Sequence, residues 1–222
     1  MRRVALLAVL AALAGCGGKN KPAPEATAVA TEQSAAGCQV VDTTGMNART
    51  TTLPKPHETL DAAKTYVAKL ETNCGSFEIT LDAKRAPVTG GSFKYLADHK
   101  FYDETLIHRI VPQFVFQGGD PQGTGEGGPG YSVVEKPPST LKYETGVVAM
   151  AKSAQEPPGT SGSQFFVVTG DDALTLEPDY ALLGKVTGGA DVVQRIGAIL
   201  TDPRTDRPDE PVLVKSVRVA EQ

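Results

Sequence analysis

The stretch GTGEGG, residues 123–128, has the glycine spacing of a dinucleotide-binding loop. Such a loop follows a strand and leads into a helix whose N-terminus faces the pyrophosphate. The preceding FVFQ could be the strand, but Pro121, Pro129 and Gly130 exclude a helix. Asp120 and Glu126 would also place negative charge beside the phosphates. We therefore expect a surface loop whose glycines allow positive φ or a close approach of the backbone.

A second candidate chemistry is serine hydrolysis. Ser161 and Ser163 lie in TSGSQ, and His108 and Asp120 could supply the other members of a triad. The nucleophile-elbow pattern is missing, and the two phenylalanines after Ser163 are typical of a strand core. We therefore reject a hydrolase and expect His108 to be a hydrogen-bonded structural residue. A metal site is not expected, because the histidines are scattered and no CxxC or Cys/His cluster occurs.

The elements that must position these residues are mostly strands. The 222-residue chain has 23 glycines, 16 prolines and no tryptophan, which favours a turn-rich β architecture. Alternating or β-rich runs predict about eight strands, and helical spacing predicts two helices, one of which places Val192, Val193, Ile196 and Ile199 on one face. Short strands at this spacing suggest a closed barrel or a sandwich. The strands are expected at 65–72, 75–82, 105–111, 113–119, 146–151, 163–170, 180–189 and 212–220, and the helices at 86–100 and 190–200.

The first sixteen residues have the pattern of an export signal. Arg2 and Arg3 precede an apolar run of about a dozen residues, which ends in LAGC. The run is too short to span about 30 Å of hydrocarbon, and LAGC resembles the bacterial lipobox, in which the cysteine carries the lipid. We expect cleavage of residues 1–15, lipidation of Cys16 and an extracytoplasmic protein anchored to the bacterial membrane, although a plain signal peptide is an alternative. The formal net charge of −4 argues against nucleic-acid binding.

Residues 16–64 are expected to form a flexible tether and a Thr/Pro-rich extension, and residues 65–222 the folded domain. Cys38 and Cys74 remain after lipidation, in a compartment where a disulfide persists. Closing the loop between them would contribute about 3 to 4 kcal/mol in the chain-entropy model. Two separate buried thiols, or a redox switch, are the alternatives.

Two long motifs, HRIVPQFVFQGGD and SGSQFFV, together with GVVAMAKS, make the chain resemble the cyclophilin family of peptidyl-prolyl cis-trans isomerases, in particular its bacterial members. The resemblance extends over residues 66–220, about 70% of the chain. It implies an eight-stranded antiparallel β-barrel capped by two α-helices, and an enzyme that rotates X-Pro bonds without a cofactor. Its partners would be proline-containing segments of exported proteins, and we expect a monomer that contacts the membrane only through its lipid.

Isomerisation needs a donor for the prolyl nitrogen and a dry pocket for the ring. Amide resonance sets a barrier of about 18 to 20 kcal/mol, and a fixed donor stabilises the twisted transition state, in which the nitrogen regains its lone pair. The resemblance assigns this role to Arg109. It implies Gln117 and Phe114 as further catalytic residues, and it implies these substrate-binding residues: Val115, Gly123, Ala151, Lys152, Ser153, Gln164, Phe166, Leu176 and Tyr180. Among them, Gln117 and Gln164 would hold the substrate backbone and orient the arginine, and 151–153 would be a strand edge for the peptide.

Four positions depart from the family's pattern. Val115 stands where the family often has Met, Lys152 where it has Asn, Thr175 where it has Trp, and Tyr180 where eukaryotic members have His. Because that Trp contributes to cyclosporin binding in the family, the pattern predicts weak sensitivity to the drug. Val115, Lys152 and Thr175 also keep an alternative open, a proline-peptide-binding or chaperone module without useful turnover.

Overall fold

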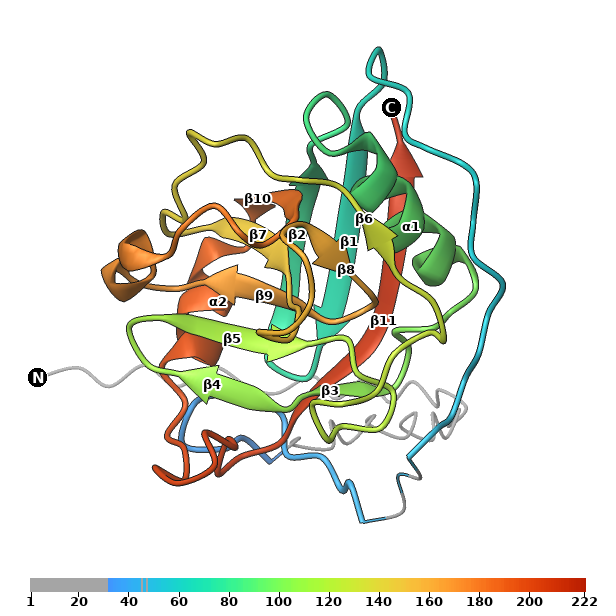
Figure 1. Ribbon diagram of the computed structural model, residues 1–222. Coiled ribbons are helices and arrows are strands. Elements are labelled where there is room, and N and C mark those ends of the chain that lie inside the picture. The colour runs from blue at the N-terminus through green and yellow to red at the C-terminus, as the bar shows by residue number, and fades with distance from the viewer. Residues whose placement is uncertain (1–31, 45, 47) are drawn as a thin grey trace, which may run out of the picture. The chain divides into compact units, whose positions relative to one another are not determined.

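The computed structural model describes residues 32–44, 46 and 48–222, and these form a β-barrel with two helices (Figure 1). The expected signal segment and Cys16 lie outside the described residues. Among the residues that are described, no helix is long and apolar enough to cross a membrane. The strands are β1 (Tyr66–Thr72), β2 (Gly75–Leu81), β3 (Thr105–Ile107), β4 (Arg109–Val111), β5 (Val115–Gly118), β6 (Val133–Val134), β7 (Val147–Met150), β8 (Thr160–Ser161), β9 (Phe165–Val168), β10 (Leu182–Gly188) and β11 (Val212–Glu221). The helices are α1 (Pro87–Asp98), α2 (Ala190–Gly197) and a 3-10 turn, η1 (Asp171–Thr175).

The main sheet closes because β3 and β4 form one nearly continuous strand. Nine strands pair in the order β3-β11-β1-β2-β10-β7-β9-β5-β4, and all pairs are antiparallel. β3 pairs with β11 and β4 pairs with β5, with only His108 between them. The N–H of His108 donates to the carbonyl of Gln117 at 3.1 Å, which continues the ladder. Counted as one strand, β3 and β4 make eight, so the expected barrel is confirmed, with β6 and β8 as a separate pair.

The barrel interior is filled by alternate residues of these strands. Phe77, Phe116 and Phe165 are essentially fully buried, and edge-to-face contacts join Phe77 to Phe116 and Phe165 to Phe93 of α1. The predicted apolar face of α2 is buried as expected, at Val192, Val193 and Ile196, and Ile199 just beyond the helix is buried too. Both predicted helices and all eight predicted strands therefore occur at the positions that the hydrophobic periodicity and the residue composition predicted.

Two glycines inside α1 are explained by the N-terminal extension, by which we mean the described residues of 32–64, because its residues 58–60 lie against this helix. A Cβ at Gly90 would overlap Leu60 Cδ1, and a Cβ at Gly91 would lie 2.5 Å from the carbonyl oxygen of Glu58. Leu60 is buried in the core, and its N–H donates to the carbonyl of Pro87 at 3.0 Å. The described part of the extension near residue 60 is therefore packed on the barrel.

The Cys38–Cys74 pair is a disulfide in the structure, and it joins the extension to the turn between β1 and β2. Both cysteines are buried. The Arg195 guanidinium of α2 donates to the carbonyl of Cys74 at 2.8 Å, and the N–H of Gln39 donates to the carbonyl of Asn73 at 2.8 Å. The extension is thus covalently fixed near residue 38 and packed again near residue 60.

Candidate active site

The antiparallel pair β4–β5 sets the position of Arg109. Arg109 is the register partner of Gln117. In the next pair along these strands, Ile110 and Phe116 are fully buried in the core. Because side chains alternate across a strand, Arg109 and Gln117 share the opposite face of the sheet. The alternation that builds the core therefore places an arginine beside a glutamine outside it.

A small pocket of about 190 Å³ lies on this face. We call it the apolar pocket. Phe166 forms one wall and stands perpendicular to Tyr180, with 5.3 Å between the ring centroids. All nine lining residues belong to the set that the family resemblance implied: Arg109, Phe114, Val115, Gln117, Ala151, Lys152, Phe166, Leu176 and Tyr180. The structure therefore brings two cationic side chains, Arg109 and Lys152, to a small cavity whose other walls include the apolar side chains of Phe114, Val115 and Phe166.

The Arg109 guanidinium is held by a residue that the sequence analysis missed. Its Nε donates to Oδ2 of Asp206 at 3.1 Å, and the backbone carbonyl of Asp206 accepts the N–H of Ile110 at 2.8 Å. Both side chains are a little over one third exposed, so the pair adds about 1 kcal/mol or less to stability. Nε is one of five donors on the guanidinium, which leaves the terminal nitrogens for a substrate.

Gln117 and Gln164 bond to each other and to the glycine-rich loop. Nε2 of Gln117 donates to Oε1 of Gln164 at 2.9 Å, and Nε2 of Gln164 donates to the carbonyls of Gly125 and Gly127 at 2.8 and 2.9 Å. Among the described residues neither glutamine hydrogen-bonds to Arg109. The arginine is therefore oriented by Asp206, and not by these amides as the resemblance had implied. The reason is the loop at 201–210, which approaches Arg109 from a part of the chain 97 residues away.

The glycine-rich loop, whose spacing resembles a nucleotide-binding loop, donates backbone hydrogen bonds to the carboxylate of Asp120. Oδ1 of Asp120 accepts the N–H of Gln122 at 2.7 Å, and Oδ2 accepts those of Thr124 and Gly125 at 2.9 and 2.7 Å. Burial alone would raise the pKa of Asp120, but these backbone hydrogen bonds lower it overall. A Cβ at Gly127 would overlap this carboxylate. The amides that a phosphate would need are therefore occupied.

Lys152 also has its charge compensated. Its side chain is 4% exposed, and Nζ lies 2.6 Å from Oδ2 of Asp179 and 5.6 Å from the centre of the Tyr180 ring. Along the expected peptide-binding edge, the N–H of Ala151 donates to the carbonyl of Gln164, and the N–H of Ser153 donates to Oε2 of Glu156. Two of the three N–H groups of this edge are therefore already bonded.

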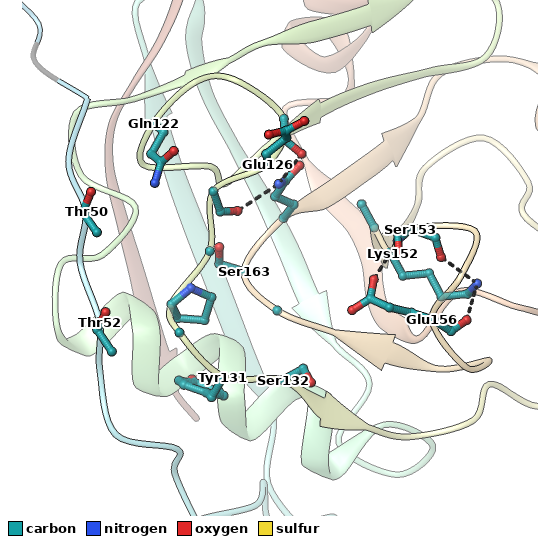
Figure 2. Close-up of a pocket in the computed structure, with 18 of the residues that line it drawn as sticks. Thr50, Thr52, Gln122, Glu126, Tyr131, Ser132, Lys152, Ser153, Glu156 and Ser163 are labelled. Atoms are coloured by element: carbon teal, nitrogen blue, oxygen red, sulfur yellow. Dashed lines mark hydrogen bonds between the residues drawn. The ribbon is translucent and has the colours of Figure 1, made fainter.

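A larger hollow of about 820 Å³ adjoins the apolar pocket, and we call it the polar groove (Figure 2). It shares Gln117, Ala151 and Lys152 with the apolar pocket. Figure 2 shows Thr50 and Thr52 on one side, Lys152, Ser153 and Glu156 on the other, and the glycine-rich loop between them. Ser153 and Gln164, predicted to bind substrate, line this groove.

Gly123 is the one predicted site residue that lines neither described hollow. Its φ is +67°, and its carbonyl accepts a hydrogen bond from Nη2 of Arg207 at 3.2 Å. The positive φ favours glycine at this position, and the close passage of substrate stays a prediction. Thr175 ends η1, where its hydroxyl donates to the carbonyl of Asp172 at 2.8 Å.

His108 is buried, but neither ring nitrogen has a hydrogen-bond partner among the described residues, contrary to expectation. Burial lowers the pKa of the His108 imidazole, and the positive charges of Arg207 and Arg109 lower it further. The negative charge of Asp120 raises this pKa, but the net shift is downward. The hydroxyl of Ser163 donates to the carbonyl of Gly119 at 2.7 Å. Within the described chain, His108 therefore forms no hydrogen bond that would activate a serine.

Comparison with known proteins agrees with this geometry. Residues 67–219 match the family model described as cyclophilin type peptidyl-prolyl cis-trans isomerase/CLD. The chain belongs to this family. Peptidyl-prolyl cis-trans isomerase B of Streptomyces anulatus is 38% identical over 175 residues, covering 71% of this chain and 98% of the relative. Peptidyl-prolyl cis-trans isomerase-like 1 of Neurospora crassa is 37% identical over 157 residues, with coverages of 69% and 93%.

Solved structures of the family also resemble this chain. A cyclophilin-type isomerase of Cryptosporidium parvum, crystallised in the presence of the dipeptide Ala-Pro, superposes with a TM-score of 0.64 and 27% identity. The match covers 69% of this chain and 98% of that structure. This cyclophilin is therefore a peptidyl-prolyl cis-trans isomerase, with the barrel expected from its motifs.

Proposed function

We propose that this cyclophilin lowers the barrier to X-Pro rotation by hydrogen bonding from the Arg109 guanidinium to the prolyl nitrogen, while the apolar pocket holds the ring. The observation that carries this proposal is the position of Arg109 among the lining residues of a 190 Å³ pocket whose other walls include Phe114, Val115 and Phe166. The Cryptosporidium parvum relative crystallised with Ala-Pro supports a proline-containing ligand.

The chemistry depends on a difference between ground state and transition state. In the planar amide the nitrogen lone pair is delocalised and accepts a hydrogen bond poorly, whereas the twisted amide has a localised lone pair. A donor fixed beside that nitrogen therefore stabilises the twist selectively, which raises kcat. Arginine suits the role because it stays charged and offers a rigid fork of donors. No proton is transferred, so the reaction needs no general base such as His108.

We further propose that the substrates are proline-containing segments of exported proteins, and that the mature chain is lipidated at Cys16. The lipobox-like LAGC supports this location, and so does the Cys38–Cys74 disulfide, because structural disulfides persist mainly in oxidising compartments. Expression in a bacterium with lipid labelling tests the anchor. Wild-type protein should carry label in the membrane fraction, and Cys16→Ser should not; label retained by Cys16→Ser would contradict lipidation at this residue.

The catalytic proposal is tested by the rate of cis-trans exchange in an Ala-Pro peptide. Removing one transition-state donor typically costs about 100-fold to 1000-fold, so Arg109→Ala should lower kcat/KM by about that factor. Arg204→Ala is the matched control, because Arg204 is 87% exposed and pairs only with Asp202 at 3.5 Å among the described residues. Unchanged exchange with Arg109→Ala would overturn the mechanism. Tight peptide binding without exchange by wild type would favour a binding module instead.

A further inference from the structure

Residues 48–53 of the N-terminal extension lie along the glycine-rich loop. The N–H of Arg49 donates to the carbonyl of Pro121 at 3.1 Å, and the N–H of Leu53 donates to the carbonyl of Pro129 at 2.9 Å. Between these points Thr50 and Thr52 are exposed and line the polar groove, whereas Thr51 is half-buried. Residues two apart share a face in an extended chain. The segment therefore presents two threonine side chains to the groove.

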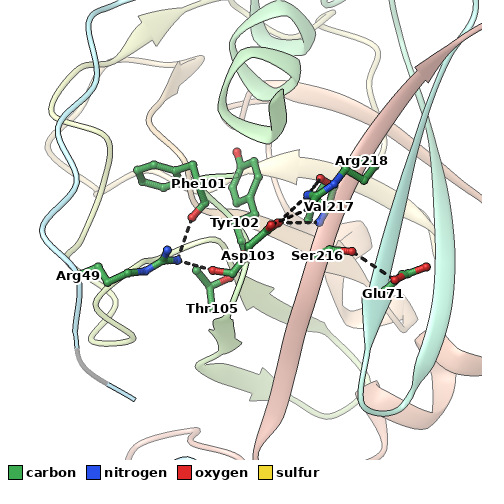
Figure 3. A network of polar contacts seen from close by, with 9 residues as sticks. All are labelled: Arg49, Glu71, Phe101, Tyr102, Asp103, Thr105, Ser216, Val217 and Arg218. Atoms are coloured by element: carbon green, nitrogen blue, oxygen red, sulfur yellow. Dashed lines mark hydrogen bonds and ion pairs between the residues drawn. The ribbon is translucent and has the colours of Figure 1, made fainter. Parts of the chain in front are cut away.

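The Arg49 side chain anchors this segment to the barrel (Figure 3). Its Nη2 donates to the carbonyl oxygens of Phe101 and Asp103. The Asp103 carboxylate in turn accepts hydrogen bonds from Nη1 and Nη2 of Arg218 in β11, both at 2.7 Å. Burial would raise the pKa of Asp103, but the bonds from Arg218 lower it overall, so the carboxylate stays charged.

The fit between extension and loop also depends on a glycine. Gly130 has a φ of +83°, and a Cβ there would lie 2.6 Å from Cγ2 of Thr52. Together with the Cys38–Cys74 disulfide upstream and buried Leu60 downstream, these contacts place the segment before any ligand arrives. Because the segment is already ordered, it loses little conformational entropy when a ligand binds.

We infer that Thr50 and Thr52 form a specificity-determining wall that contacts the residues flanking proline in a bound peptide. This inference rests on the proposed function. A peptide whose proline fills the apolar pocket must continue across Gln117 and Ala151, which are shared with the polar groove. The opposite side of that groove, beyond the glycine-rich loop, is the extension (Figure 2).

The charges of the groove define the flanking residue that it prefers. Glu126 and Glu156 line it, and the single lining cation, Lys152, is neutralised by Asp179 at 2.6 Å. The described lining therefore carries excess negative charge, and a lysine or arginine beside the proline is favoured over a glutamate. Because the groove is open to solvent, the preference is modest and is screened by salt.

Two peptides of equal length test the wall, one with lysine and one with glutamate on both sides of an Ala-Pro unit. For the full wild-type chain we expect kcat/KM to be about three-fold to ten-fold higher for the lysine peptide, and the ratio to approach one at about 1 M salt, where the Debye length is about 3 Å. Thr52→Lys and, separately, Thr50→Lys should each lower this ratio about three-fold or more. Thr59→Lys is the control, because Thr59 is an exposed threonine of the same extension that is absent from the described groove lining.

The outcomes separate the two proposals. A lowered ratio with Thr52→Lys and Thr50→Lys, but not with Thr59→Lys, supports the wall. Equal ratios for all four proteins, with both peptides still accelerated, would overturn the wall and leave the isomerase proposal intact. If wild type accelerates neither peptide, the proposed function fails instead.

Discussion

Asp206 offers the sharpest test of how Arg109 is positioned. Its carboxylate accepts from Nε of Arg109 at 3.1 Å, and its φ of +56° lies in the left-handed region. Asp206→Gly removes the carboxylate without backbone strain, because glycine adopts positive φ freely. Asp206→Asn removes the charge but keeps an acceptor, and asparagine also tolerates this conformation.

The expected loss follows from the freedom of the arginine side chain. When an unrestrained arginine is held in the reactive position, the loss of its rotamer entropy costs up to about 2 kcal/mol. At 1.36 kcal/mol per factor of ten, this limits the effect to about 30-fold. Because Arg109 is only partly exposed in the native protein, we expect Asp206→Gly to lower kcat by about 5-fold to 30-fold, and Asp206→Asn by less. KM should change by less than about two-fold, since the arginine acts mainly in the transition state.

Exchange rates of an Ala-Pro peptide, measured over a range of concentrations, separate kcat from KM. Asp209→Asn is the matched control, an exposed aspartate of the same loop. In the Arg109→Ala background, Asp206→Gly should have almost no further effect, because it acts only through the arginine. A similar loss in both backgrounds, or a loss in KM alone, would refute the positioning role.

Replacing Cys38 and Cys74 by serine should lower the free energy of unfolding by about 4 kcal/mol, the chain-entropy value for a sequence separation of 36; equal denaturation midpoints with and without the disulfide would contradict this. Reductant should leave the Ala-Pro exchange rate of the folded protein unchanged, and a reductant-dependent rate would favour the redox switch. Because burial depresses the pKa of His108 below 6.5, its contribution to stability is complete above about pH 6.5 and is lost as pH falls through the folded pKa. Thermal melts between pH 7.5 and 5 should therefore fall more steeply for wild type than for His108→Leu, and parallel curves would refute the assignment.

The elements of this cyclophilin could be predicted from the sequence because they depend on local patterns. Alternation at 65–72 and 75–82 predicted the β1–β2 hairpin, and helical spacing at 190–200 predicted the buried face of α2. The resemblance also supplied every residue that lines the apolar pocket, since its motifs surround those positions. Residue type and hydrophobic periodicity are properties of a few neighbouring residues. Elements can therefore be predicted from them without knowing how the chain folds in space.

What joins distant segments was decided only by the tertiary structure. No spacing rule connects Arg109 with Asp206, which are 97 residues apart, or predicts that Asp120 would occupy the amides of the glycine-rich loop. The composition predicted a Thr/Pro-rich extension, but not that the N–H groups of Arg49 and Leu53 would hydrogen-bond to the glycine-rich loop. These contacts depend on how the closed barrel places its loops in space, because a hydrogen bond requires two groups within about 3 Å however far apart they lie in the chain.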